Sequence, residues 1–298
     1  MIDVPEMQID SDGVPRGQLV VDTLIALLDL EVLEDNLFRG RSPEVSPTRV
    51  FGGQVAAQSL TAVGRTVPAD RRVHSLHGYF IRPGDPRVPI VYEVDRTRDG
   101  RSFTTRRVRA IQHGEAIFTM SASFQVDEPG IDHAIAMPDV PAPEDLPTYA
   151  ERLAPARESL ELLARIPRPF DIRYVSDPPW APRQAGPHPE GRSQVWFRTD
   201  GSVPDDPLLQ VCLMAYASDL TLLNSVLINH GFAQRPQMAS LDHAMWFHRP
   251  FRMDDWVLYD TSSPSASGAR GLGMGYFFAR DGRLLSTVVQ EGLVRLPR

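Results

Sequence analysis

Three polar side chains in the second half of the chain could do chemistry together. Asp219 interrupts an apolar stretch, and on a helix it would share its face with apolar neighbours. Because an unpaired buried carboxylate is costly, Asp219 needs partners or a function, or else it is a helix N-cap. Ser240 and Gln290 fall in expected strands and could hold a water molecule or a carbonyl group. Either could equally be an ordinary strand residue whose polar groups are satisfied.

Other reactive residue types are less promising. Asp242 and His243 are adjacent on an expected strand, so they point to opposite faces and would not cooperate readily. His74 and His77 also have opposite parity, and no carboxylate or cysteine joins them, so we expect no metal site. Cys212 stands among apolar residues, which favours packing over a nucleophilic role.

Composition excludes several classes of protein. The 298 residues carry a net charge of −7, which argues against a nucleic-acid binder. Lysine is absent, which excludes Schiff-base chemistry, and no Gly-x-Ser-x-Gly motif is present. The glycines of 271–275 lie in a strand-like segment, where a dinucleotide loop would not form. The most apolar stretch, 19–33, contains three acidic residues, and the N-terminus does not resemble a signal peptide. With a single cysteine, this predicts a cytoplasmic protein that does not bind a membrane.

The chain repeats itself. Phe51–Val55 precedes an Arg-Pro whose arginine lies 28 residues after Gln54, and Tyr216–Leu220 precedes one whose arginine lies 30 residues after Asp219. The offsets of 165 and 167 residues between the two copies indicate a duplicated domain. The first copy has Gln54 where the second has Asp219.

The repeat and the turn residues predict the domain organisation. We expect a flexible leader (1–18), a first copy (19–126), a proline-rich connector (127–190) with one helix at 159–166, and a second copy (191–298). Each copy should be a principal helix followed by antiparallel strands, which is an α+β architecture. The first helix is expected at 53–63, and the second should start after the N-cap Asp206 and continue to about residue 228. The strands are expected at 73–81, 88–97, 102–112 and 116–126, and at 238–248, 256–261, 268–280 and 284–296.

A group of arginines in the first copy could bind a phosphate-bearing ligand such as coenzyme A. The alternative is a solvated strand face with surface ion pairs. The group comprises Arg96, Arg98, Arg101, Arg106, Arg107 and Arg109. Arg101, Arg106, Arg107 and Arg109 are the predicted substrate contacts.

Taken together, these stretches resemble the acyl-CoA thioesterase II family. The matching runs span most of the chain from about residue 24 to 295: 37–40, 50–55, 79–85 and 100–103 in the first copy, and 201–206, 216–220, 242–250 and 290–292 in the second. The resemblance implies a double hotdog fold, in which two tandem helix-wrapped antiparallel sheets form one long sheet. It also implies hydrolysis of fatty acyl-CoA without a metal or cofactor, and a homodimer or homotetramer. The family's catalytic trio falls on Asp219, Ser240 and Gln290, with Ser240 in place of the commoner threonine.

The resemblance leads to a mechanistic hypothesis. Asp219 would act as general base on a water that Ser240 and Gln290 orient, and N–H groups near the start of the Asp219 helix would stabilise the oxyanion. Because Gln54 replaces the acid in the first copy, we expect one active site per chain. Two alternatives stay open. The first is an enoyl-CoA hydratase of the same fold, which would need a histidine a few residues after the aspartate, whereas the next one here is His230. The second is a non-catalytic acyl-CoA-binding protein.

Overall fold

The computed structural model describes residues 8–9, 14–43, 49–154, 166–178, 191–230 and 236–296. The helices are α1 (Gln18–Leu28), α2 (Gly52–Gly64), α3 (Tyr149–Leu153), α5 (Pro207–Ser218) and α6 (Asn224–Ile228), with a 3-10 turn at Pro143–Asp145. The strands of the first half are β1 (Gln8–Ile9), β2 (Pro15–Arg16), β3 (Glu31–Glu34), β4 (Leu37–Gly40), β5 (Arg71–Phe80), β6 (Ile90–Asp99), β7 (Phe103–Gln112) and β8 (Glu115–Val126). Those of the second half are β9 (Phe170–Tyr174), β10 (Arg192–Thr199), β11 (Gln237–Ser240), β12 (Asp242–Phe247), β13 (Val257–Ser267), β14 (Arg270–Ala279) and β15 (Leu284–Arg295).

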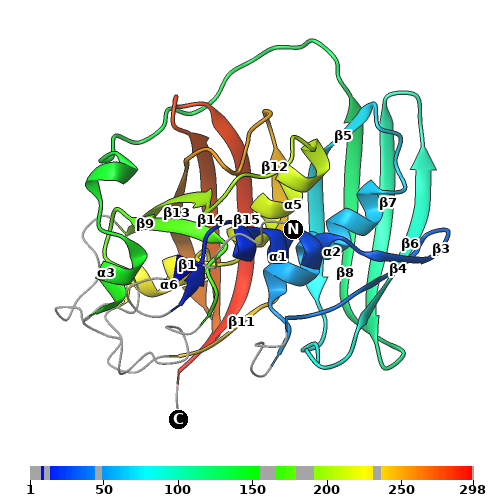
Figure 1. The fold of residues 1–298 in the computed structure, drawn as a ribbon, viewed down its shortest axis with the longest axis horizontal. Coiled ribbons are helices and arrows are strands. Elements are labelled where there is room, and N and C mark those ends of the chain that lie inside the picture. The colour runs from blue at the N-terminus through cyan, green and yellow to red at the C-terminus, as the bar shows by residue number, and fades with distance from the viewer. Residues whose placement is uncertain are drawn as a thin grey trace, which may run out of the picture.

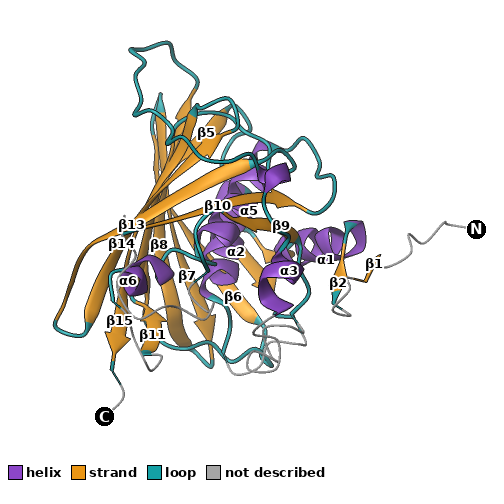
Figure 2. Cartoon of the chain, turned by 90° about the vertical axis from the view of Figure 1, so that its left-hand side faces the viewer, coloured by secondary structure: helices purple, strands orange, loops and turns teal. Residues whose placement is uncertain are grey.

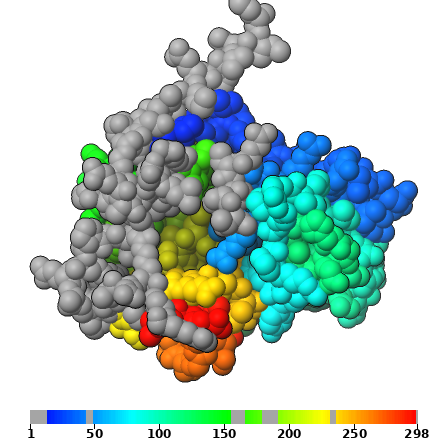
Figure 3. Space-filling view, turned by 90° about the horizontal axis from the view of Figure 1, so that it is seen from below, coloured from blue at the N-terminus to red at the C-terminus, as the bar shows by residue number. Residues whose placement is uncertain are grey.

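One antiparallel sheet runs through both halves. Its order is β3-β4-β6-β7-β8-β5-β12-β15-β14-β13-β10-β9, and β11 pairs with β15. In the first half, the strands lie in the order β4-β6-β7-β8-β5. Their counterparts in the second half lie in the reverse order, β12-β15-β14-β13-β10, as a two-fold relation between two copies requires. The copies join where β5 pairs with β12, from Asp242↔Tyr79 to Trp246↔Ser75. The duplication and the single long sheet expected from the sequence are therefore confirmed, and the halves lie side by side in Figure 3.

The principal helices pack on one side of this sheet (Figures 1 and 2). Nearly every residue of α2 is buried, because its alanines and small polar residues let it lie close to both the sheet and α5. Helix α5 starts as predicted: the Asp206 carboxylate accepts the N–H of Leu208 at 2.9 Å, and Pro207 occupies the first turn. It ends earlier than predicted, because turns separate Ser218 from α6.

The connector covers the outer face of the second half. The loop after β8 arches over the top of the molecule in Figure 1, and Met137 and Val140 pack against an apolar cluster that includes Trp196 and Trp256. The indole N–H of Trp196 donates to the carbonyl of Pro141 at 3.0 Å. This burial explains how residues 127–142 are held in place without a helix or a strand.

Contacts lie on both sides of two predicted boundaries. Near the end of the predicted leader, Val14 is buried, and the N–H of Gly17 donates to Asp200 at 2.8 Å. Strand β9 lies within the predicted connector but pairs with β10 and so belongs to the sheet. The predicted helix at 159–166 lies outside the described residues except for Ile166. In the described part of the chain, no helix is long and apolar enough to cross a membrane.

Candidate active site

Asp219 lies immediately after α5, where it is the C-cap residue. This corrects the expectation that it starts a helix: residues 219–223 form turns, and the next helix begins only at Asn224. Asp219 therefore cannot be an N-cap, and the N–H groups that follow it do not form a helix N-terminus. The residue retains some accessible surface while its carboxyl group is enclosed by protein.

Both predicted partners reach the Asp219 carboxylate. The amide Nε2 of Gln290 donates to Oδ1 at 2.7 Å, and the hydroxyl of Ser240 donates to the same oxygen at 3.3 Å. Gln290 is completely buried on β15, whereas Ser240 is half-buried at the end of β11. Strands β11 and β15 pair, with Ser240 opposite Gly292, which explains how residues 50 positions apart arrive at one oxygen.

The other carboxylate oxygen faces the N-terminus of α2, from the first half of the chain. A methyl group added at Gly52 would lie 2.7 Å from Oδ2, and the backbone N–H of Gly53 hydrogen-bonds to the carboxylate. Gly53 is equally tight, because a Cβ there would lie 2.6 Å from the carbonyl oxygen of Tyr216. The helix N-terminus that faces the site is thus that of α2, not the one predicted from the second copy.

Burial dominates the electrostatics of the site. Desolvation raises the pKa of Asp219, against the opposing effects of the nearby His243 and of the hydrogen bonds from Gln290, Gly53 and Ser240. The carboxylate is therefore a stronger base than an exposed aspartate. The hydrogen bonds fix the position of the Asp219 carboxylate, while burial raises its basicity.

His243 is a neighbour that the sequence did not identify. The prediction that Asp242 and His243 point to opposite faces of the strand is confirmed. The Asp242 carboxylate accepts the N–H of Glu291 at 2.7 Å, whereas His243 points into the core with 1% of its surface exposed. Its Nε2 lies 2.9 Å from the Ser218 hydroxyl, next to Asp219 in sequence. Strand parity separates His243 from Asp242 but does not show which residues of other strands lie beside it.

An apolar cavity opens beside the candidate site. It has a volume of about 390 Å³ and is lined by residues adjacent to Asp219, by β9, and by parts of α3, α6 and β11. The part of the cavity wall next to Asp219 is formed by Tyr216, Leu220 and Thr221. Phe170 stacks on Tyr216, with ring centroids 6.1 Å apart. The size and the lining suit an apolar ligand.

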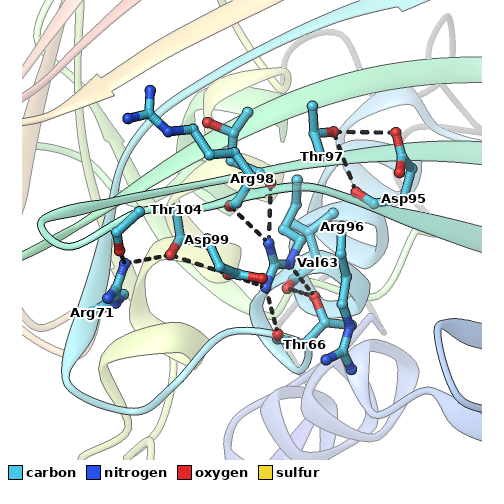
Figure 4. A network of polar contacts seen from close by, with 12 residues as sticks. Val63, Thr66, Arg71, Asp95, Arg96, Thr97, Arg98, Asp99 and Thr104 are labelled. Carbon is cyan, nitrogen blue, oxygen red and sulfur yellow. Dashed lines mark hydrogen bonds and ion pairs between the residues drawn. The ribbon is translucent and has the colours of Figure 1, made fainter.

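The predicted arginine contacts are not brought to this site. Arg106 is 1% exposed, and its guanidinium donates to Thr66 and Asp99, at 2.9 and 2.7 Å, and to nearby carbonyls. Thr66 and Asp99 are labelled within this network of polar contacts in Figure 4. The guanidinium is buried on the helix-facing side of β7, and a contact between Arg106 and substrate stays a prediction. Arg101 and Arg107 are exposed, and Arg109 pairs with Glu93 at 3.2 Å.

The remaining candidates have structural roles. Burial raises the pKa of Cys212 to about 12, and its sulfur accepts the hydroxyl of Thr61 at 3.4 Å. His74 and His77 lie on the same outer face, not on opposite faces. The register shifts between Val73 and Ser75, so the additional residue reverses the alternation. Both histidines lie on the side of the sheet away from the helices.

The chain is similar along most of its length to known thioesterases. A family model described as "Acyl-CoA thioesterase" matches residues 167–293, and one described as "Acyl-CoA thioesterase N-terminal domain" matches residues 41–125. Acyl-CoA thioesterase 2 of Haemophilus influenzae is 40% identical over 286 residues, which cover 93% of this chain and 98% of that protein. The chain belongs to the acyl-CoA thioesterase II family.

Solved structures support the assignment to the acyl-CoA thioesterase II family and its fold. The acyl-CoA thioesterase II TesB2 from Mycobacterium marinum is 48% identical, with a TM-score of 0.76 over 92% of this chain and 98% of that one. A hot dog fold protein from Alicyclobacillus acidocaldarius is 21% identical, with a TM-score of 0.75 over 93% of this chain and 99% of that one. The fold is therefore the double hotdog that the sequence resemblance implied, and the chain is an acyl-CoA thioester hydrolase.

Proposed function

We propose that this enzyme hydrolyses fatty acyl-CoA to a free fatty acid and coenzyme A, with Asp219 as general base. The observation that carries the proposal is the convergence of Ser240 and Gln290 on one oxygen of a buried carboxylate. A buried carboxylate requires hydrogen-bond donors, and here the donors come from two strands and a helix N-terminus and meet beside an apolar cavity. Such an arrangement is suited to hold a water molecule against the base.

In the proposed reaction, Asp219 removes a proton from water as the water oxygen attacks the thioester carbonyl carbon. Ser240 and Gln290 fix the direction of attack, because each can hydrogen-bond to the water as well as to the carboxylate. The tetrahedral intermediate carries a negative oxygen, and the N-terminus of α2 at Gly52 and Gly53 is the nearest source of backbone donors and positive dipole. Collapse of the intermediate breaks the C–S bond, and the proton held by Asp219 passes to the departing thiolate.

The acyl chain would occupy the cavity beside Asp219. Its walls are mostly aromatic and aliphatic, and it begins at Tyr216 and Leu220, on either side of the carboxylate in sequence. This position directs an acyl chain away from the carboxylate while the thioester stays beside it. An acyl-CoA panel from acetyl to palmitoyl, followed by thiol release, would define the length that the cavity accepts.

Replacing Asp219 with asparagine tests the assignment. We expect turnover to fall roughly 10²–10⁴-fold, since the base is lost while shape is kept. Asp260→Asn is a matched control, because burial also raises the pKa of Asp260, which lies on β13 and pairs with Arg192. If Asp219→Asn is folded and retains most of its turnover, the assignment is wrong. Hydration of crotonyl-CoA without thiol release would instead favour a hydratase.

We also propose that the enzyme assembles as a homodimer or homotetramer. The outer face of the first half presents large exposed side chains, including Tyr79 at 62% and Phe103 at 43% of their surface. Exposed aromatic groups of this kind are common where proteins associate. Light scattering coupled to gel filtration would measure the assembly, and a monomer at working concentration would contradict the proposal.

A further inference from the structure

His243 and Gln290 lie beside each other on paired strands. Ala244 on β12 is opposite Val289 on β15, so one step further along the pair His243 reaches the level of Gln290. Their side chains are buried, at 1% and 0% exposure. Neighbouring strands hold such side chains close enough to interact directly.

In each of these two side chains, one polar atom has a hydrogen-bond partner and the other polar atom has none. Nε2 of His243 lies 2.9 Å from the Ser218 hydroxyl, and Nε2 of Gln290 donates to Asp219 at 2.7 Å. Nδ1 of His243 and Oε1 of Gln290 are both buried, and by strict hydrogen-bond geometry neither has a partner among the described residues. A side-chain hydrogen bond between His243 and Gln290 nevertheless contributes to the pKa of the histidine, so the two side chains are within reach of each other. A buried polar atom without a partner is unfavourable, so two adjacent ones of complementary type call for an explanation.

We propose that His243 is a positioning residue that holds the amide of Gln290 through a hydrogen bond from its Nδ1–H to Oε1. This bond fixes which end of the amide faces Asp219. A glutamine amide can turn over and exchange its oxygen and nitrogen, and an oxygen turned toward the carboxylate would repel it. The inference rests on the proposed role of Gln290 in the reaction.

Ser218 completes the arrangement. With the ring hydrogen on Nδ1, Nε2 must accept a hydrogen bond from the Ser218 hydroxyl, which lies 2.9 Å away. This hydroxyl also lies 2.8 Å from the carbonyl oxygen of Ala215, so the arrangement requires its single hydrogen to turn from that carbonyl to Nε2. Burial lowers the pKa of His243 although Asp219, Asp242 and Gln290 each raise it, so the ring carries a single hydrogen near neutral pH. The resulting sequence of contacts runs from Ser218 through His243 and Gln290 to Asp219, which is bonded covalently to Ser218.

Two substitutions of His243 separate its two contacts. Asparagine places a side-chain nitrogen at the position of Nδ1, so His243→Asn can restore the contact with Gln290. Glutamine extends to the position of Nε2, so His243→Gln can restore only the contact with Ser218. His243→Leu removes both.

We expect His243→Leu and His243→Gln to lower kcat on the order of 10- to 100-fold, since misplacing a reacting group by about 1 Å costs up to about 10². His243→Asn should recover most of kcat. KM should change little in all three, because His243 is not among the described residues that line the cavity. His248→Leu is the matched control: its Nε2 also lies 2.9 Å from a hydroxyl, that of Thr287, but on the outer face.

The decisive measurement repeats His243→Leu in a Gln290→Ala background. If the histidine acts through the amide, the second substitution adds no further loss of kcat. Additive losses, or a His243→Gln variant better than His243→Asn, would overturn the inference. If Gln290→Ala alone leaves kcat unchanged, the proposed function fails instead. Thermal melting shows which variants fold, and the asparagine–glutamine comparison remains decisive if the leucine variant does not.

Discussion

A single methyl group at Gly52 should lower the kcat of the enzyme without unfolding it. The Cβ of Gly52→Ala would lie 2.7 Å from Oδ2 of Asp219 and 3.1 Å from the Phe80 ring, whereas ordinary contact begins at 3.4 Å. The carboxylate or the helix must therefore move by about 0.7 Å. Oδ1 is held by two donors on the opposite side, so this movement strains the hydrogen bonds that define the base.

The cost to catalysis is expected to be large relative to the displacement. A misplacement near 1 Å in an active site can lower the rate on the order of 10²-fold, so we expect a loss of about 10- to 100-fold in kcat. Stability should change little or improve. Gly52 is the first residue of α2, its φ is not positive, and alanine favours a helix by up to about 1 kcal/mol over glycine.

The assay is thiol release from a medium-chain acyl-CoA, with thermal melting of the same samples. Gly130→Ala is the control, because Gly130 has no atom within 4 Å of its added Cβ and no positive φ. Normal turnover in Gly52→Ala would refute the idea that the position of the Asp219 carboxylate governs the rate. A large fall in melting temperature would show instead that the glycine serves the fold.

Other predictions follow from the same contacts. Ser240→Ala should lower kcat about 10- to 100-fold, the value of a hydrogen bond to a charged group, whereas Ser240→Thr should retain activity in the same thiol assay. Because burial raises the pKa of Asp219, kcat/KM should fall as pH drops through a pKa above the usual value of about 4, measured as a pH–rate profile. Because the pKa of Asp219 is higher in the folded than in the unfolded protein, the free energy of unfolding decreases as pH rises through the pKa of the folded state. Asp219→Asn should therefore melt at a higher temperature than wild type at neutral pH, and an unchanged or lower value would contradict the shift. Arg106→Met should cost about 2–3 kcal/mol in urea unfolding while the folded variant keeps its kcat, since its guanidinium contacts protein groups.

Most of the fold could be predicted because its signals are local or repeated. Alternation and turn residues located β5 to β8, β14 and β15 to within two residues, and Asp206-Pro207 marked the start of α5. Strand β13 continues six residues beyond its predicted end at residue 261. The end of α5 was wrong, because apolar residues continue through the turns to Ile228 and periodicity does not distinguish a turn packed in the core from a helix. The bulge beside His74 was missed for a similar reason, since one additional residue reverses parity without a compositional signal.

The sequence drew attention to three side chains of the candidate site but not to their surroundings. Asp219, Ser240 and Gln290 were singled out by residue type and by the family resemblance, and Ser240 and Gln290 both donate to one oxygen of Asp219. The position of His243 beside Gln290 depends on strand register, and the approach of Gly52 depends on how two halves of the chain pack. Neither follows from local sequence. For the arginines, charge alone does not distinguish a ligand contact from a buried guanidinium such as Arg106, so their contacts with substrate stay predictions.

The packing of the halves also bears on why one active site per chain is expected. In the first half, Gln54 occupies the position of the acid, and its amide donates to Arg41, Ser42 and Gln58 at 3.0 to 3.3 Å. The amide nitrogen of Gln54 therefore makes its contacts within the first half of the chain. The same helix presents Gly52 and Gly53 to Asp219 of the second half. The first copy therefore lacks a base of its own but supplies one wall of the proposed site. A second copy without its partner would keep Asp219, Ser240 and Gln290 and lose the helix N-terminus that faces them.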